Sequence, residues 1–231
     1  MVDDRARINA VTATHYADSA IRYRQDAYNA SGLFAWEEAA VERYFGDVAT
    51  LLVASAGGGR QVLALTGRGF NVSAFECSPL LVEEGRRRLE RAGVQPAFVL
   101  AAPDEVPKLG MFDGVIVGWG AYSHIAGSAA RVAFLRRLRE QIAGNGPILV
   151  SFRMGSRASR HLRTIAALGT AIRRLRRRGE PVEIGDELRG TFGHSAIRDE
   201  IEQELDAAGF QPLFYSAEPF GHAVGIARAR A

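Results

Sequence analysis

Residues 50–76 read TLLVASAGGGRQVLALTGRGFNVSAFE, and this stretch decides the fold. Residues 51–54 form a continuous apolar run, as in a strand buried on both faces, and a glycine triplet follows at 57–59. A helical pattern then leads to a second strand that ends at Glu76. Glycines let a backbone approach a ligand closely, the first amides of a helix attract anionic groups, and such an acid accepts hydrogen bonds from ribose hydroxyls. The stretch therefore predicts a nucleoside-binding half-site.

Strands and helices alternate along the rest of the chain, which predicts a parallel sheet wound on both faces. Two N-terminal helices divided at residues 31–32 are expected to lead into the first strand. Further strands are predicted at 97–100, 112–117 and 147–152, with helices at 79–92, 131–142 and 195–208 and a loop at 179–193. The last two strands, 211–216 and 222–227, are joined too closely for a helical crossover, so they should be antiparallel.

The composition is that of one α/β domain: 231 residues, 47% of them hydrophobic and 24% charged. No apolar run reaches 18 residues, and the first residues lack a basic region followed by an apolar core. We therefore expect a cytoplasmic protein without a membrane span. Cys77 is the only cysteine, which excludes an intrachain disulfide and a thiolate-clustered zinc site, and no metal is expected.

The basic residues are concentrated in one segment. Eight arginines and no carboxylate lie at residues 157–178, while the rest of the chain is mildly acidic. Helical apolar spacing predicts an inserted helical element that covers an anionic acceptor, because guanidinium groups pair with carboxylate and phosphate. A solvated helix face is the alternative. Nucleic acid is disfavoured, since the segment has no interleaved aromatic residues.

The chain resembles the class I S-adenosylmethionine-dependent methyltransferases over nearly its whole length. The resemblance rests on the segments VASAGGGRQVLAL, FNVSAFECSP, FDGVIVGWGAYSHI, GNGPILVSF and AAGF…FYSAEP…VGIARA. It implies a doubly wound, mostly parallel, seven-stranded Rossmann-like sheet whose last strand is antiparallel. Within one domain, 1–231, it implies an N-terminal helical lid at 1–46, a donor-binding core at 47–154, the arginine-rich acceptor cover at 155–194, and a last helix with a terminal hairpin at 195–231.

The family's glycine loop, an acid followed by three spaced glycines, falls on residues 53–59. Val53 stands in place of the acid and Ser55 in place of the first glycine, so position 53 cannot supply the family's contact to the methionine amino group of the donor. Glu76 matches the ribose-binding acid. The resemblance implies S-adenosylmethionine as the donor and S-adenosylhomocysteine as its product. The donor-binding residues that it implies are Ser55, Ala56, Gly57, Gly59, Glu76, Cys77, Ala102, Gly118 and Trp119, with Tyr16 and Tyr23 from the lid.

His124 is the candidate general base, because it lies just past the fourth strand, where open α/β sheets bind ligands. Tyr122 is the second catalytic candidate, and packing or capping is the alternative role for both residues. The predicted reaction is methyl transfer to an oxygen atom of a small-molecule or modified-peptide acceptor, in specialised metabolism. A non-catalytic binding or scaffold protein and an RNA methyltransferase are the alternatives. A homodimer remains open.

Overall fold

The computed structural model describes residues 4–18, 21–155, 164, 168–171 and 182–229. All eight arginines of the predicted cover at 157–178 lie outside the described residues. The covering of an anionic acceptor by that segment therefore stays a prediction. No helix in the described part of the chain combines the length and the apolar composition that crossing a membrane requires.

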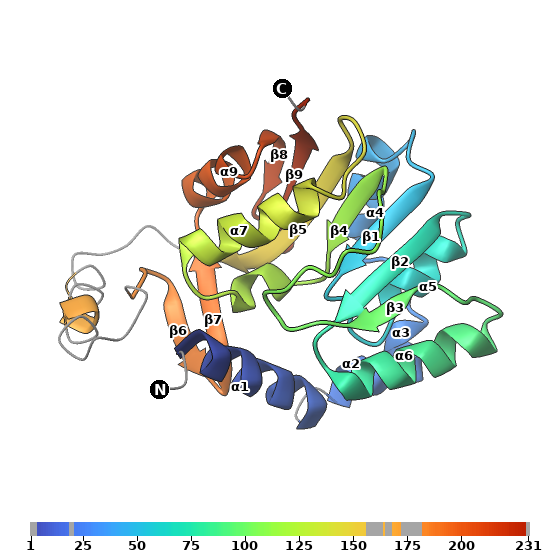
Figure 1. Ribbon diagram of the computed structural model, residues 1–231, viewed down its shortest axis with the longest axis horizontal. Helices are drawn as coiled ribbons and strands as arrows, with labels where there is room; N and C mark the ends of the chain where they lie inside the picture. The colour runs from blue at the N-terminus through green and yellow to red at the C-terminus, as the bar shows by residue number, and fades with distance from the viewer. Residues whose placement is uncertain (1–3, 19–20, 156–163, 165–167, 172–181, 230–231) are drawn as a thin grey trace.

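The predicted sheet is confirmed. Five parallel strands stand in the order β3-β2-β1-β4-β5 (Figure 1). Beyond β5, strand β9 pairs antiparallel with β5, and β8 pairs antiparallel with β9. The bounds of these strands are β1 Thr50–Ala54, β2 Asn71–Glu76, β3 Phe98–Leu100, β4 Gly114–Val117, β5 Pro147–Met154, β8 Phe210–Ser216 and β9 Gly221–Ala227. The central strands β1 and β4 are apolar runs buried on both faces, as a parallel sheet covered by two helical layers requires.

Two further strands were not expected. Strand β6, Asp186–Arg189, and strand β7, Thr191–Ala196, form a hairpin around Gly190, whose φ of 76° suits glycine. The end of β5 pairs in parallel with β7 at Arg153 and Met154. The loop predicted at 179–193 is therefore wrong from residue 186 onward, where the hairpin begins, and residues 179–181 lie outside the described residues. The helix start at 195 is also wrong, because the pairing with β5 draws residues 195 and 196 into the sheet. Helix α9 begins at Arg198.

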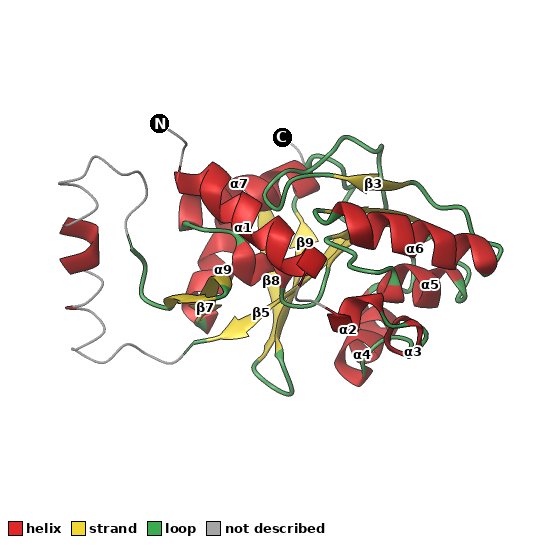
Figure 2. Cartoon of the chain, turned by 90° about the horizontal axis from the view of Figure 1, so that it is seen from below, coloured by secondary structure: helices red, strands yellow, loops and turns green. Residues whose placement is uncertain are grey.

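Helices cover both faces of the sheet, as Figure 2 shows. One apolar cluster joins the sheet to α7 and α9, and the other joins it to α4, α5 and α6. Before Gly32, the described residues form three helices where one was expected. The bounds are α1 Asp4–Asp18, α2 Ile21–Arg24, α3 Asp26–Asn29, α4 Ala35–Tyr44, α5 Arg60–Thr66, α6 Pro79–Arg91, α7 Ser128–Arg139 and α9 Arg198–Ala207, with a 3₁₀ turn, η1, at Ala121–His124.

Helix α1 lies along the carboxyl edge of the sheet, between β7 and α6 (Figure 1). Two side-chain contacts fix it there. The hydroxyl oxygens of Thr12 and Thr191 are 3.1 Å apart, and the Asn9 amide donates a hydrogen bond to Asp104 in the loop after β3. The N-terminal helices and the hairpin thus roof the end of the sheet where ligands of open α/β folds bind.

Candidate active site

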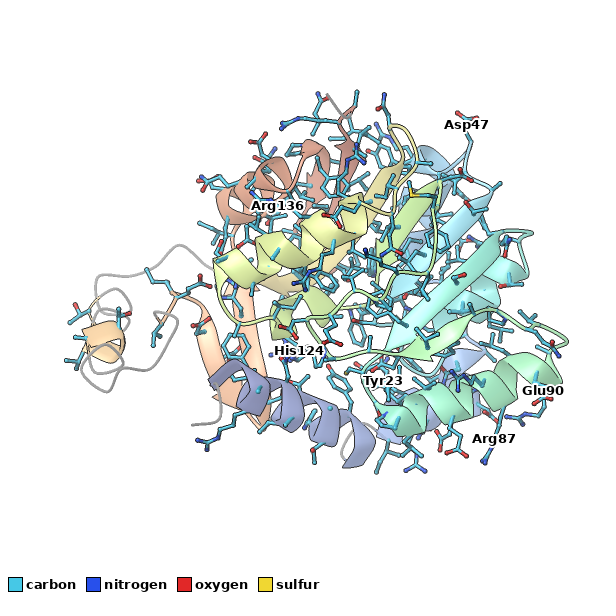
Figure 3. The ribbon with its side chains drawn as sticks, viewed as in Figure 1. Tyr23, Asp47, Arg87, Glu90, His124 and Arg136 are labelled. Carbon is cyan, nitrogen blue, oxygen red and sulfur yellow. The ribbon has the colours of Figure 1, made fainter. Side chains whose placement is uncertain are left out.

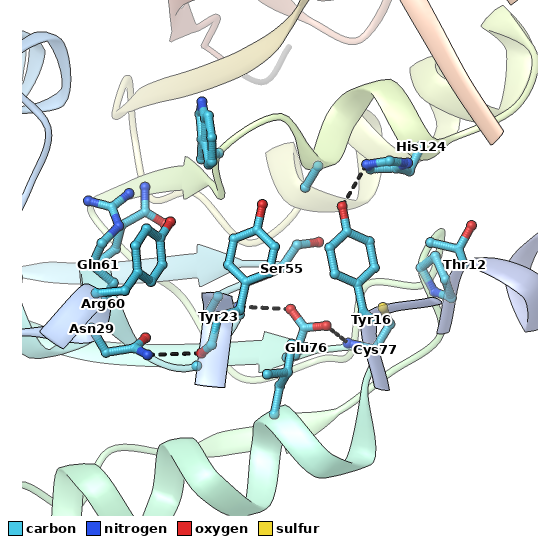
Figure 4. Close-up of a pocket in the computed structure, with 18 residues that line it drawn as sticks. Thr12, Tyr16, Tyr23, Asn29, Ser55, Arg60, Gln61, Glu76, Cys77 and His124 are labelled. Carbon is cyan, nitrogen blue, oxygen red and sulfur yellow. Dashed lines mark hydrogen bonds between the residues drawn. The ribbon is translucent and has the colours of Figure 1, made fainter. Parts of the chain in front are cut away.

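A cavity lies beneath this roof, over the carboxyl ends of β1, β2 and β4 (Figure 4). It brings together nine of the thirteen site residues predicted from the sequence, namely Tyr16, Tyr23, Ser55, Ala56, Gly57, Glu76, Cys77, Trp119 and His124. Its remaining lining comes from Thr12, Tyr28, Asn29, Gly58, Arg60, Gln61, Leu81, Pro103 and Ala121. Segments that are more than 100 residues apart in the sequence, from Thr12 to His124, therefore share one space.

Glu76 is held rigidly at the floor of the cavity. Its carboxylate is 4% exposed and accepts hydrogen bonds from the backbone amides of Gly57 at 2.8 Å, Cys77 at 2.8 Å and Ser78 at 3.0 Å. A carboxylate has about four lone-pair positions, so three amides leave capacity for a ligand hydroxyl. The three amide donors also fix the orientation of the carboxylate, and with it the direction of its unused lone pair.

The turn between β1 and α5 keeps a left-handed backbone conformation at Ser55, which stands in place of the first glycine of the loop. Ser55 has a φ of 56°, in the left-handed region that few residues other than glycine adopt. A Cβ atom at Gly118 would lie 2.1 Å from the Ser55 carbonyl oxygen, so glycine is required there by the close approach of β4. Gly118 thus shapes the turn from behind and does not line the cavity.

Gly59 and Ala102 also lie outside the cavity lining. Gly59 precedes α5 with a φ of 96° and faces Leu89 of α6, and Ala102 donates its backbone amide to Glu105 at 3.3 Å. Pro103 lines the cavity in place of Ala102. Both predicted residues therefore act on the site only through the backbone that they shape.

Tyr122 and His124 point in different directions from the same 3₁₀ turn. Tyr122 is buried in the core, and its hydroxyl donates to Glu204 at 2.6 Å, in an ionic cluster remote from the cavity. Burial and the Glu204 carboxylate raise the pKa of Tyr122. We therefore leave Tyr122 out of the site. Figure 3 shows His124 and Tyr23 directed inward beneath α1.

His124 and Tyr16 form a neutral hydrogen-bonded pair. The Nδ1 atom of His124 lies 2.7 Å from the carbonyl oxygen of Phe192, so Nδ1 carries the proton, and Nε2 accepts a hydrogen bond from the Tyr16 hydroxyl at 2.7 Å. Burial lowers the pKa of His124 to about 4, while burial and the nearby Tyr23 and Glu76 raise the pKa of Tyr16 far above its usual range. At neutral pH the imidazole is an uncharged proton acceptor.

Sequence reasoning missed the wall of the cavity beside the glycine turn. The Arg60 guanidinium makes two hydrogen bonds of 2.6 Å to Glu37, and the Gln61 amide donates to the same carboxylate at 2.8 Å. Both charged side chains are buried. Glu37 lies in α4 and Arg60 in α5, so no local pattern could have predicted the pair.

A cluster of Glu183, His194 and Glu200 has ligand atoms within 4.8 Å of one another, as a metal site would. The guanidinium of Arg131 occupies the position that a metal ion would take, because it donates to Glu183 at 2.8 Å and to Glu200 at 2.7 Å. Burial alone would lower the pKa of His194, but hydrogen bonds to Asp186 and Glu200 outweigh it and raise the pKa to about 9. Arg131 and a protonated His194 therefore supply positive charge to this group of carboxylates.

Comparison with solved structures decides the fold. An S-adenosylmethionine-bound amino pentose methyltransferase of Micromonospora echinaspora superposes with a TM-score of 0.62 at 15% identity, covering 91% of this chain and 96% of that one. The chain has the class I methyltransferase fold. No protein-family model matches it, and a search of curated proteins found no significant match.

Two other structures with this fold match nearly the whole chain. The 1,6-didemethyltoxoflavin-N1-methyltransferase of Burkholderia thailandensis has a TM-score of 0.66 at 18% identity, covering 98% of this chain and 88% of that one. The magnesium protoporphyrin IX methyltransferase of Synechocystis PCC 6803 has a TM-score of 0.64 at 13% identity and covers 99% of both. These neighbours contain S-adenosylmethionine or S-adenosylhomocysteine and act on small molecules of different chemistry.

Proposed function

We propose that this protein is an S-adenosylmethionine-dependent methyltransferase that methylates a small molecule or modified peptide at oxygen, in specialised metabolism. One observation carries the proposal: the glycine turn and the amide-held Glu76 share a cavity with the neutral Tyr16–His124 pair. The fold and the small-molecule chemistry of its structural neighbours, among them an enzyme of calicheamicin biosynthesis, support the proposal.

The residues of the cavity fit the donor. Glu76 would accept from a ribose hydroxyl, and Cys77, Leu81 and Pro103 flank the side on which the adenine would lie. The tyrosine rings provide π-faces of the kind that attract a cation, with ring centres 5.6 Å apart for Tyr16 and Tyr23. When bound, the donor supplies a methyl group on a positively charged sulfonium.

The Tyr16–His124 pair suits an acceptor that must lose a proton. A hydroxyl acceptor can pass its proton to the Tyr16 oxygen while the Tyr16 proton moves to His124 Nε2. The Phe192 carbonyl accepts from Nδ1 and so stabilises the imidazolium that forms. An acceptor carboxylate would need no such relay, and the pair therefore favours a hydroxyl.

Calorimetry with S-adenosylhomocysteine tests the donor site. Replacement of Glu76 by Ala should raise the dissociation constant about tenfold or more, because charge-assisted hydrogen bonds to the ribose are lost. Glu90→Ala, on the solvent side of α6, is the matched control and should leave affinity unchanged. Absence of binding to the wild-type protein at millimolar ligand would rule out the proposed function and favour a scaffold role.

A further inference from the structure

The methionine end of the donor site lacks its usual acid. Val53 occupies that position, is 0% exposed, and packs in the apolar cluster beneath α4, α5 and α6. An α-ammonium group brought to this end of the cavity loses water and needs a hydrogen-bond acceptor in its place. This inference rests on the proposed function and concerns which atom of this chain takes that role.

Glu37 is a buried carboxylate behind the wall residues Arg60 and Gln61, and it is already saturated. It accepts from the Phe34 backbone amide at 2.7 Å, twice from Arg60 and once from Gln61. These four donors fill the four lone-pair positions of a carboxylate. Glu37 therefore serves to fix Arg60 and Gln61 in the wall and has no capacity for a ligand ammonium.

Asn29 offers an acceptor that is not used. Its side chain lines the cavity and is 1% exposed. The Nδ2 atom donates to the carbonyl oxygens of Tyr23 and Gln25, both at 2.8 Å. Because two carbonyls can only accept, the orientation of the amide is fixed, and Oδ1 faces away from them. Among the residues that the structure describes, Oδ1 has no hydrogen-bond partner.

The position of Asn29 matches the methionine end. A Cβ atom at Gly58 would lie 2.2 Å from the Tyr23 carbonyl oxygen and 2.8 Å from Asn29 Oδ1, so this glycine lets the 23–29 segment lie directly against the turn. Figure 4 shows Asn29 beside Arg60 and Gln61, on the side of Glu76 opposite His124. With ribose at Glu76, the amino-acid part of the donor extends toward Asn29.

We infer that Asn29 Oδ1 accepts a hydrogen bond from the α-ammonium group of the donor, in place of the acid that position 53 lacks. A buried acceptor without a hydrogen-bond partner lowers the stability of the folded protein. A charged donor such as an ammonium group makes a stronger hydrogen bond to a neutral carbonyl oxygen than a neutral donor does. The two Nδ2 bonds fix the orientation of the amide, and with it the direction of Oδ1, before the ligand arrives. The ammonium is thus held from the N-terminal roof instead of from β1.

Three ligands separate this role from a structural one: S-adenosylhomocysteine, its analogue S-(5′-adenosyl)-4-thiobutyrate without the α-amino group, and 5′-methylthioadenosine without the amino-acid part. Calorimetry on the wild-type protein should give at least tenfold weaker binding of the thiobutyrate than of S-adenosylhomocysteine. Asn29→Ala should weaken S-adenosylhomocysteine about tenfold, change 5′-methylthioadenosine less than about twofold, and abolish the discrimination between the first two ligands. Glu76→Ala, in contrast, should weaken all three.

Each other result contradicts the inference. Unchanged affinity of Asn29→Ala for S-adenosylhomocysteine, or an equal loss for 5′-methylthioadenosine, would overturn it. If the variant does not fold, the wild-type comparison decides: equal affinity for the thiobutyrate and S-adenosylhomocysteine would show that the ammonium is not recognised. If the wild-type protein binds 5′-methylthioadenosine but does not distinguish the other two ligands, the role inferred for Asn29 is refuted and the proposed function is not. Failure to bind any of the three refutes the proposed function with it.

Discussion

His124 accepts a hydrogen bond at neutral pH because burial lowers its pKa to about 4. The proton-accepting form is therefore present throughout the physiological range, and only acid should remove it. We predict that kcat/KM of the wild-type enzyme stays level from about pH 8 to pH 5 and falls toward pH 4. A pH–rate profile measures this, and an acidic limb centred near 6.5, the usual pKa of histidine, would show a solvated imidazole.

The relay also predicts how the two partners behave when they are changed. His124→Ala should lower kcat by roughly 10²-fold, and Tyr16→Phe should lower it similarly, because either change breaks the same proton path. The double variant should be little worse than each single one. Arg7→Ala, on the exposed surface of α1, is the control. Steady-state kinetics measure all four, and additive losses for the pair would argue against a relay.

Residues that act within one local stretch could be predicted, whereas residues brought in from afar could not. Glu76 and Gly57 follow one strand and one turn, so their spacing in the sequence carries the geometry. Asn29 reaches the turn only through packing of the N-terminal segment against Gly58, a contact without a sequence pattern. Tyr122 and His124 lie two residues apart, and only the 3₁₀ turn shows that their side chains leave in different directions.

At the scale of elements, the β6–β7 hairpin was missed because its stability comes from partners far away in the chain. Its sequence, DELRGTFGHSA, lacks a clear apolar alternation, and its strands are fixed by pairing with β5 and by buried charges. His194 on β7 contacts Asp186 at 2.9 Å and Glu200 at 2.8 Å, with Glu183 3.7 Å away. Arg131 of α7 pairs with two of these carboxylates, Glu183 and Glu200.

This cluster predicts a loss of stability in mild alkali. The folded pKa of His194, about 9, lies above the unfolded value of 6.5, so its contribution is complete below pH 6.5 and disappears as pH rises to 9. The free energy of unfolding should fall by up to about 3 kcal/mol across that window, at 1.36 kcal/mol per pKa unit. Denaturant titrations of the wild type and His194→Gln measure it. Equal slopes against pH in both proteins would place the linkage elsewhere.

At the scale of the whole molecule, the sheet was predictable because apolar runs and helical spacing recur in the order that a doubly wound fold requires. The core depends on this pattern alone: among the described residues, both apolar clusters begin at Leu33 or later. The roof lies outside both clusters, and α1 to α3 are held by polar contacts, such as Thr12 with Thr191 and Asp26 with Arg88, and by ring contacts such as Tyr28 with Phe34. The same chain thus combines an apolar core with a cover of polar and aromatic contacts.

This division predicts that the roof can be removed without loss of the core. A chain that begins at residue 31 lacks Tyr16, Tyr23 and Asn29 of the cavity but none of the described residues of the apolar clusters. It should unfold cooperatively, yet gain no stability from S-adenosylhomocysteine, whereas the full chain at 100 times its dissociation constant should gain about 2.7 kcal/mol. Thermal melts with and without ligand, followed by circular dichroism, measure both. Equal stabilisation of the two chains would mean that the sheet edge alone binds the ligand, and a shortened chain without a cooperative melt would mean that the polar contacts of α1 to α3 hold the core together.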